Sequence, residues 1–206
     1  MIYKIVCAGE NHFKNLYIKD EEEVIIAVDG GLTVLKNMNV DISYFFGDCD
    51  SLNNSDKDLL KYIPSNLYKA EKDQTDLELA LDFVIKNYKV NDKIIIYNAT
   101  GKRLDHYEGA LRLLKKFCDY DIELVDDLNH ISVYKKSQEK YYFKKNEFKY
   151  ISFFNIYPDT IITLVGFKYP LDHYLMKEND CLCISNQIEE EGYMLANNDI
   201  LVIKSK

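Results

Sequence analysis

Short apolar runs recur through the first half of the chain, with helical patterns between them. The runs that predict strands are Ile2–Ala8, Val24–Val28, Tyr44–Phe46, Lys93–Tyr97 and Ile122–Val125. Most are continuous rather than alternating, which is typical of strands covered on both faces. Apolar residues at helical spacing predict helices over Gly31–Met38, Asp56–Tyr62, Thr75–Tyr88 and Asp105–Phe117. Strands that alternate with helices predict an α/β fold, a doubly wound, mostly parallel sheet with helices on both faces.

The pattern changes after about Asp127. Short β-rich segments follow at Ile131–Tyr134, Tyr141–Phe143, Tyr150–Ile156, Ile161–Leu164, Cys181–Ile184 and Ile200–Ile203. Turn residues separate them at Lys145-Asn146, Pro158-Asp159, Glu191-Gly192 and Asn197-Asn198. This spacing predicts a small antiparallel sandwich or barrel. We therefore expect two domains, an α/β domain over residues 1–127 and an all-β domain over residues 128–206.

Composition narrows the function classes. The net charge of −8 argues against a general nucleic-acid binder, which needs a basic face, but not against a nucleotide. The chain starts without the apolar segment of a signal peptide, and no uncharged apolar run approaches the ~20 residues that span a bilayer. Five cysteines, odd in number and scattered, fit neither a disulfide framework nor a zinc knuckle. We expect a reduced cytoplasmic protein without a membrane or nucleic-acid partner.

Clusters of acidic residues follow the apolar runs of the first half. They are Asp29-Gly30-Gly31, Gly47-Asp48-Cys49-Asp50-Ser51, Asp73-Gln74-Thr75-Asp76 and Arg103-Leu104-Asp105-His106. If the runs are parallel strands, the clusters reach the same carboxyl edge, where open α/β sheets bind ligands. Carboxylates crowded there repel one another unless a cation lies between them. The clusters therefore predict a magnesium–polyphosphate site.

The two aspartate pairs each have a plainer interpretation. Asp48 and Asp50 lie two residues apart, point to the same side of an extended segment and can hold one hard cation, although a polar turn explains them equally well. Asp73 and Asp76 flank a helix start, where the helix dipole favours carboxylates. Thr75 already provides the cap there, and Glu78 completes a capping box. Both aspartates therefore exceed what capping requires.

The segment Ala99–His106 forms a strand-to-helix turn that contains glycine, a ready anion site. Lys102 and Arg103 add two cations, and a guanidinium can bind phosphate oxygens through two hydrogen bonds. The spacing of a P-loop is missing. Asp105 is alternatively a simple N-cap, and His106 a surface histidine.

Taken in order, these segments resemble the bacterial thiamine pyrophosphokinases. The resemblance rests on Ala27–Gly31, Gly47–Ser51, Lys72–Asp76, Ala99–His106, Gly166–Leu171 and Ser185-Asn186. It covers nearly the whole chain. Lys102 departs from the family, which frequently has a second glycine there, and Cys49 stands where an aromatic residue is common.

The resemblance implies an ATP-binding α/β domain, a β domain that contributes to thiamine binding, and a homodimer with thiamine sites at the subunit junction. It implies transfer of a diphosphoryl group from ATP to the thiamine hydroxyl, which releases AMP. The implied magnesium ligands are Asp48, Asp50 and Asp76, and the implied catalytic residues are Asp73, Arg103 and Asp105. We expect Asp29, Gly30, Gly31, Ser51, Thr100, Gly101, Lys102 and His106 to bind the nucleotide, and Thr75, Tyr169, Ser185 and Asn186 to bind thiamine.

Other functions stay open at this point. The same ATP and metal site would serve a pyrophosphokinase for another alcohol, such as a pterin. The residues that distinguish the two acceptor alcohols would then lie in the β domain. Paired aspartates also serve metal-dependent phosphohydrolases, which release phosphate without an alcohol acceptor. A nucleotide-binding regulatory module is a further alternative. Asp73 and Asp105 are both candidates for the group that accepts the hydroxyl proton.

Overall fold

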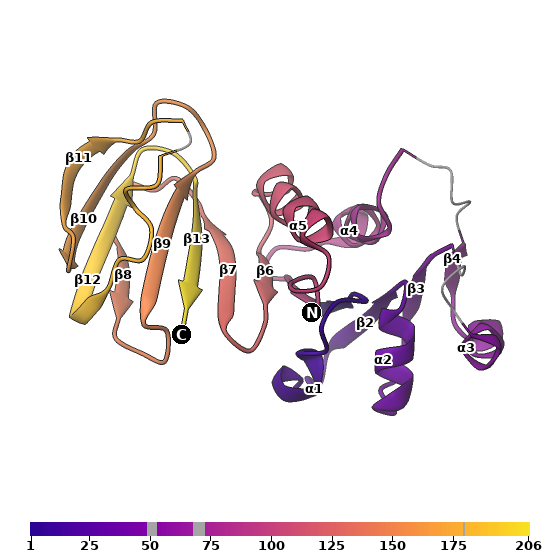
Figure 1. Ribbon diagram of the computed structural model, residues 1–206. Helices are drawn as coiled ribbons and strands as arrows, with labels where there is room; N and C mark the ends of the chain where they lie inside the picture. The colour runs from indigo at the N-terminus through magenta and orange to yellow at the C-terminus, as the bar shows by residue number, and fades with distance from the viewer. Residues whose placement is uncertain (49–52, 68–72, 179) are drawn as a thin grey trace. The chain divides into compact units, whose positions relative to one another are not determined.

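The computed structural model describes residues 1–48, 53–67, 73–178 and 180–206 (Figure 1). Asp50 and Ser51 of the predicted site, and Lys72, lie outside these residues. The chain divides into two compact units. The first comprises Met1–Leu113 and Tyr120–Asp127, and the second comprises Leu114–Asp119 and Leu128–Lys206. Each unit has its own architecture.

The first unit is built on a parallel sheet. Its strands are β1 (Ile2–Val6), β2 (Glu23–Val28), β3 (Tyr44–Gly47), β4 (Ser65–Leu67), β5 (Lys93–Tyr97) and β6 (Ile122–Val125). They lie in the order β4-β3-β2-β1-β5-β6, and each neighbouring pair is parallel. The chain adds β2, β3 and β4 on one side of β1 and then places β5 on the other side. The topological switch point, where open α/β sheets bind ligands, therefore lies between β1 and β5.

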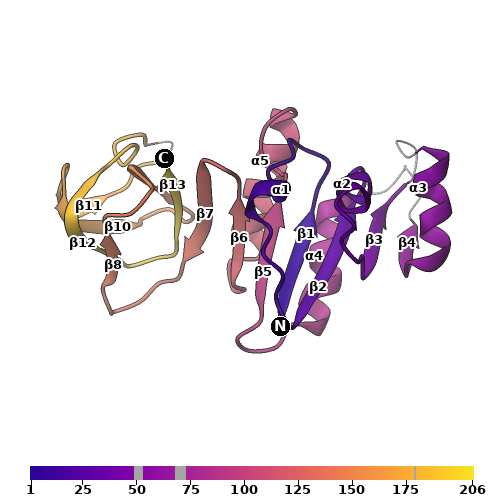
Figure 2. The same ribbon diagram turned by 90° about the horizontal axis from the view of Figure 1, so that it is seen from below.

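Helices cover both faces of this sheet (Figures 1 and 2). They are α1 (Phe13–Leu16), α2 (Gly31–Asn37), α3 (Asn54–Leu59) with a 3-10 turn over Leu60–Tyr62, α4 (Asp76–Asn87) and α5 (Leu104–Lys116). On one face Phe13 of α1 and Leu32 of α2 pack in a core with Val6. On the other face Phe83 of α4 packs against Tyr44, with ring centroids 4.7 Å apart. The predicted doubly wound α/β fold is confirmed.

The second unit consists of antiparallel strands. They are β7 (Asn129–Tyr134), β8 (Tyr141–Lys144), β9 (Tyr150–Asn155), β10 (Ile161–Phe167), β11 (Leu171–Leu175), β12 (Ile188–Ala196) and β13 (Ile200–Ser205). They pair in the orders β7-β13-β9 and β11-β10-β12-β8. Phe153 and Val202 from the first group pack in one core with Phe143, Leu164 and Met194 from the second. The unit is therefore a β sandwich, as the sequence predicts.

Two predictions in this unit are wrong. Cys181–Ile184 is a turn and not a strand, because Cys183 is buried in the sandwich core from a turn in which Ile184 N donates to Cys181 O. Gly192 lies inside β12 and not in a turn. A Cβ there would lie 2.7 Å from Val165 O, so this glycine lets β12 approach β10 where the pairing register shifts.

Four elements escaped sequence prediction. One is the nine-residue strand β12, where Glu191-Gly192 was expected to be a turn. The other three are short. Helix α1 has four residues, strand β4 has three, and β11 is a largely exposed edge strand, so none of them carries a long apolar pattern. No helix among the described residues is long and apolar enough to cross a membrane.

Candidate active site at the carboxyl edge of the parallel sheet

Asp29 and Gly47 meet at the ends of neighbouring strands. Asp29 follows β2 with a positive φ of 49°, and its N–H donates to Phe46 O over 2.9 Å. A Cβ on Gly47 would lie 2.7 Å from Asp29 Oδ1. Gly47 therefore leaves the space that the Asp29 carboxylate occupies. Asp48 comes directly after Gly47 and is half-buried, so the structure brings Asp29 and Asp48 to adjacent strand ends.

Gly30 and Gly31 form the start of α2. A Cβ on Gly31 would lie 1.9 Å from Val6 O, closer than any real contact, whereas a Cβ on Gly30 would lie 3.1 Å from the Ala8 Cβ. Gly31 thus allows the helix to lie directly on the end of β1. This packing explains the second glycine without a ligand, and the nucleotide-binding role of both glycines stays a prediction.

Asp73, Thr75 and Asp76 lie at the start of α4. Thr75 is the N-cap, and its Oγ1 accepts a hydrogen bond from Glu78 N at 3.2 Å, which confirms the predicted cap. Asp76 is half-buried and Asp73 is exposed. Because α4 connects the parallel strands β4 and β5, it runs from the carboxyl edge back to the amino edge. The start of α4 therefore lies at the carboxyl edge of the sheet, as Asp48 does.

The described residues contain no group of three or more His, Cys, Asp or Glu side chains placed to hold a metal ion. Asp50, one of the three predicted ligands, lies outside that search. The predicted convergence of Asp48, Asp50 and Asp76 on one cation stays a prediction.

The turn between β5 and α5 has an unusual backbone. Asn98, Gly101 and Lys102 have φ values of 58°, 76° and 37°. Lys102 therefore keeps a conformation that favours glycine, the residue frequent there in the family that the chain resembles. Thr100 is buried, and its Oγ1 has no hydrogen-bond partner in the described part of the chain. The turn ends at the start of α5, where free backbone N–H groups favour anions.

Arg103 and Asp105 bind each other through two hydrogen bonds. Arg103 Nε donates to Asp105 Oδ1 at 3.2 Å, and a terminal guanidinium nitrogen donates to Oδ2 at 2.5 Å. The pairing lowers the pKa of Asp105 to about 2 and raises the pKa of Arg103. Both side chains are exposed, as is His106 beside them. Asp105 is the second residue of α5, so the alternative in which it is the N-cap is wrong.

The predicted thiamine segment lies in the second unit, where Asn186 joins its two parts. Asn186 is 2% exposed, and its Oδ1 accepts hydrogen bonds from Tyr169 N at 3.0 Å and Gln187 N at 2.9 Å. Its Nδ2 donates to Tyr169 O at 2.8 Å. Ser185 is exposed and has a φ of 58°. The structure therefore brings Tyr169, Ser185 and Asn186 together, with the Asn186 amide used to hold the Tyr169 backbone.

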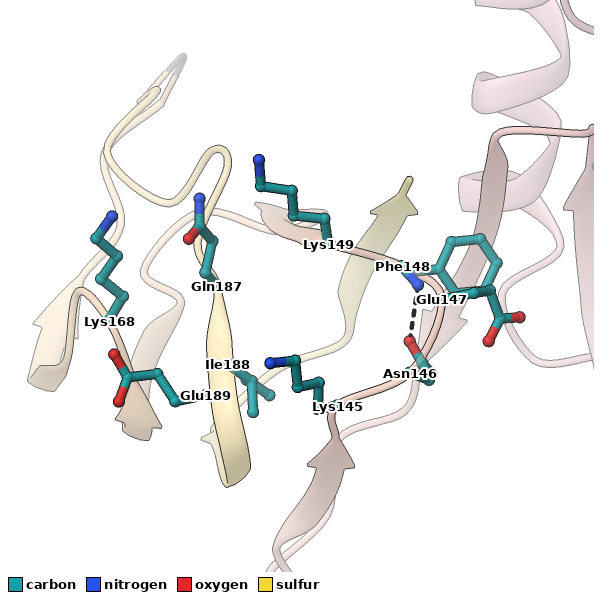
Figure 3. A pocket seen from close by; sticks show the side chains of 9 residues that line it. All are labelled: Lys145, Asn146, Glu147, Phe148, Lys149, Lys168, Gln187, Ile188 and Glu189. Carbon is teal, nitrogen blue, oxygen red and sulfur yellow. Dashed lines mark hydrogen bonds between the residues drawn. The ribbon is translucent and has the colours of Figure 1, made fainter.

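A cavity of about 390 Å³ lies beside this segment (Figure 3). Its charged lining residues are Lys145, Lys149, Lys168, Glu147 and Glu189. The remaining lining residues are Asn146, Phe148, Gln187 and Ile188. Lysines outnumber glutamates, so the lining has a net positive charge and does not by itself favour a cation such as thiamine. Of its lining residues, Lys168 belongs to the Gly166–Leu171 motif and Gln187 directly follows Ser185-Asn186.

The sequence reasoning also missed the connection between β1 and α1, which lies at the switch point. Gly9 N donates to Asn98 O at 2.9 Å, and His12 Nδ1 lies 2.9 Å from Asp127 Oδ2. A signal was present, because Gly9, Glu10 and His12 follow the first apolar run just as the acidic clusters follow later ones.

Comparisons with known proteins agree with this architecture. Residues 16–125 match the family model described as "Thiamin pyrophosphokinase, catalytic domain", and residues 138–200 match "Thiamin pyrophosphokinase, vitamin B1 binding domain". The chain is 38% identical over 194 residues to a thiamine pyrophosphokinase of Bacillus subtilis, a match that covers 90% of this chain and 89% of that relative.

Solved structures show the same similarity. A thiamine pyrophosphokinase from Bacillus subtilis superposes with a TM-score of 0.85 at 32% identity, covering 100% of this chain and 99% of the other. One from Geobacillus thermodenitrificans gives a TM-score of 0.83 at 30% identity, covering 100% and 98%. The chain therefore belongs to the thiamine pyrophosphokinase family, as the sequence motifs predicted.

Proposed function

We propose that this enzyme transfers the diphosphoryl group of ATP to the hydroxyl of thiamine at the carboxyl edge of the parallel sheet, which gives thiamine diphosphate and AMP. The observation that carries the proposal is the match of two family models, one catalytic and one for vitamin B1, in order along one chain. A pyrophosphokinase for a pterin, a phosphohydrolase and a regulatory module do not predict the second match.

We propose Mg²⁺ as the metal, with Asp48, Asp50 and Asp76 as its protein ligands. Carboxylate oxygens are the donors that Mg²⁺ prefers, and it commonly takes one or two of them together with substrate phosphates. Asp48 follows β3 and Asp76 opens α4, both half-buried on the carboxyl side of the sheet. A bound Mg²⁺ would offset the charge of the triphosphate.

The nucleotide is proposed to lie along the turns of the same edge. The turn Thr100–Lys102 supplies backbone N–H groups, a lysine ammonium and the start of α5, which together suit a phosphate. Asp29, Gly30 and Gly31 lie at the β2 end of the same edge, and His106 lies in the first turn of α5. Ser51, which lies outside the described residues, is the remaining proposed nucleotide-binding residue. These assignments rest on the sequence motifs and on the placement of the described residues.

Of the two candidate proton acceptors, Asp73 fits better than Asp105. The pKa of Asp105 is held at about 2 by Arg103, so its carboxylate is a weak base near neutral pH. Asp73 is exposed at the start of α4. Arg103 donates two of its five N–H groups to Asp105, so the other three can donate to phosphate oxygens and would offset the charge that develops on the departing AMP.

We propose that residues 1–127 form the ATP- and Mg²⁺-binding catalytic domain and that residues 128–206 contribute to thiamine binding and to a homodimer. Thr75, Tyr169, Ser185 and Asn186 are the proposed thiamine-binding residues. Asn186 acts through the backbone of Tyr169, because its side-chain oxygen and nitrogen are both used there. We place the enzyme in the cytoplasm, which agrees with the thiols of Cys7, Cys118 and Cys183 that form no disulfide among the described residues.

The test is incubation of the protein with ATP, Mg²⁺ and thiamine, with all products quantified. We expect AMP and thiamine diphosphate in equal amounts. ADP, or phosphate released without an acceptor, would contradict the proposal. Asp48→Asn should lower turnover about 10²–10³-fold with an unchanged urea midpoint. Asp58→Asn, the same change at an exposed aspartate of α3 paired with Lys61, is the matched control and should keep full activity.

A further inference from the structure

One buried asparagine joins the two connections that flank the switch point. Asn98 directly follows β5 and is 0% exposed. Its Oδ1 accepts hydrogen bonds from His12 N and Phe13 N, both at 2.9 Å, at the start of α1. Its backbone oxygen accepts a third hydrogen bond from Gly9 N at 2.9 Å. The residue therefore ties the β5–α5 turn to the β1–α1 connection through both its side chain and its backbone.

The two connections also fit each other closely in space. A Cβ on Gly9 would lie 2.1 Å from Asn98 O and 2.9 Å from Thr100 O, and a Cβ on Gly101 would lie 3.2 Å from Glu10 Oε2. Gly9 thus permits a backbone approach that any side chain would prevent, and Gly101, with its positive φ, lies against the Glu10 side chain. A shift of one connection must therefore move the other.

The backbone of Asn98 suits this role. Its φ of 58° lies in the left-handed region, which asparagine tolerates better than most residues other than glycine. Glycine could adopt the same backbone but could not supply the acceptor for the two N–H groups of α1. Asn98 Nδ2 and Thr100 Oγ1 are buried and have no hydrogen-bond partner among the described residues, so the turn keeps two polar groups unpaired.

We propose that Asn98 is a positioning residue for the ATP phosphates. It holds Thr100, Gly101 and Lys102 in the conformation that receives the triphosphate by fixing their turn to the start of α1. The proposal rests on the nucleotide site proposed above. Without the side chain of Asn98, two hydrogen bonds are lost and ATP has to order the turn as it binds. Since each such bond is worth a factor of about five, KM for ATP should rise roughly tenfold or more.

The variants separate the side chain from the backbone conformation. Asn98→Gly removes the acceptor and keeps the positive φ accessible. Asn91→Gly is the matched control, because Asn91 is an exposed asparagine with a φ of 74° in the turn before β5, at the opposite edge of the sheet.

Steady-state kinetics with each substrate varied in turn measures the KM for ATP and the KM for thiamine of each variant. For Asn98→Gly we expect a KM for ATP about tenfold higher, a KM for thiamine within twofold of wild type, and the same AMP and thiamine diphosphate products. Asn91→Gly should match the wild type in both KM values.

The proposal is overturned if Asn98→Gly leaves KM for ATP within twofold of wild type, or if it raises KM for ATP and KM for thiamine equally. If Asn98→Gly does not fold, Asn98→Ser replaces it, because the shorter serine side chain does not reach both N–H groups. We expect the same result, a raised KM for ATP and an unchanged KM for thiamine. A wild-type enzyme that forms no thiamine diphosphate would refute the proposed function, whereas an active enzyme whose KM values do not split would refute only the role of Asn98.

Discussion

Replacing Lys4 by methionine should destabilise the first unit strongly, because this lysine is buried in the middle of β1. The residue is 1% exposed. Its Nζ donates to Ile18 O at 2.5 Å and pairs with Asp20 Oδ2 at 2.6 Å and Glu23 Oε2 at 2.7 Å. It also lies 4.9 Å from the centroid of the Tyr17 ring. One ammonium thus holds the whole connection from α1 to β2 against the sheet.

The magnitude follows from what remains after the substitution. Removing one partner of a buried ion pair costs about 3–5 kcal/mol, because the other charge stays buried without compensation. Asp20 is 40% exposed and can turn to water, and Glu23 keeps the hydroxyl of Tyr17 and the N–H of Asp20. Methionine fills the volume of the lysine stem, so no large cavity adds to the cost. We therefore expect a loss of about 3 kcal/mol, at the lower end of that range.

Urea unfolding followed by far-ultraviolet circular dichroism measures this loss. With a typical slope of about 2 kcal/mol per molar urea, the midpoint should fall by about 1.5 M. Glu23→Gln and the double variant complete a double-mutant cycle, in which the coupling between Lys4 and Glu23 should exceed about 1 kcal/mol. A loss below about 1 kcal/mol for Lys4→Met, or additive effects, would refute the reasoning.

The same pair should be visible in the pH dependence. Burial alone would raise the pKa of Glu23, but hydrogen bonds from Lys4, Tyr17 and the Asp20 N–H hold it below its ordinary value of 4.5. A carboxyl with a lowered pKa in the folded state stabilises the fold above its unfolded pKa, and this contribution disappears as the pH falls through the folded value. Wild-type stability should therefore fall below about pH 4.5, and Lys4→Met should show a shallower fall.

Two further predictions concern neighbouring residues with different roles. Gly31→Ala should lower the free energy of unfolding by about 2–3 kcal/mol because its methyl group would meet a backbone oxygen at 1.9 Å, whereas Gly30→Ala should change it by less than about 1 kcal/mol; equal urea midpoints would contradict this packing explanation. Ser185→Ala should raise KM for thiamine but not KM for ATP, with stability unchanged, whereas Asn186→Ala should cost at least about 2 kcal/mol of stability through its lost hydrogen bonds. An unaltered thiamine dependence in the first variant, or an unaltered melting temperature in the second, would count against these roles.

Much of the first unit could be predicted from sequence because its strands are buried on both faces. Ile94–Tyr97 is a continuous apolar run and Ile122–Val125 is interrupted only by Glu123; the predicted segments Lys93–Tyr97 and Ile122–Val125 are β5 and β6 with the predicted bounds. The helix that begins after Thr75 combined a capping pattern with a clear apolar stripe, and two independent signals fixed its start. Where the apolar pattern and the capping residues indicate the same element, the sequence alone predicts its bounds.

Close backbone contacts were not predictable. Gly31 and Gly47 could be read as ligand-binding glycines, but only the structure shows that a Cβ on either would meet Val6 O or Asp29 Oδ1. Gly192 was expected in a turn for the same reason, since its neighbour Val165 on β10 lies 27 positions earlier in the sequence. Such contacts depend on which strands pair, and periodicity carries no information about that.

The site was predictable in its location and less so in its internal pairing. Parallel strands place Asp29 and Asp48 at one edge whatever the remaining sequence. The pairing of Arg103 with Asp105, and the use of the Asn186 amide by the Tyr169 backbone, depend on side-chain directions set by local turns. Asn98 carried no motif, because its importance lies in the α1 residues that it meets across the switch point.

The location of the nucleotide and the metal is the claim on which the proposed chemistry depends. A crystal structure of the enzyme with Mn²⁺ and a non-hydrolysable ATP analogue measures it directly through the anomalous signal of manganese. We expect the manganese peak within coordination distance of Asp48 and Asp76 and the phosphates against the Thr100–Lys102 turn. A peak away from both aspartates, or phosphates seated instead among Lys145, Lys149 and Lys168 of the second unit, would contradict it.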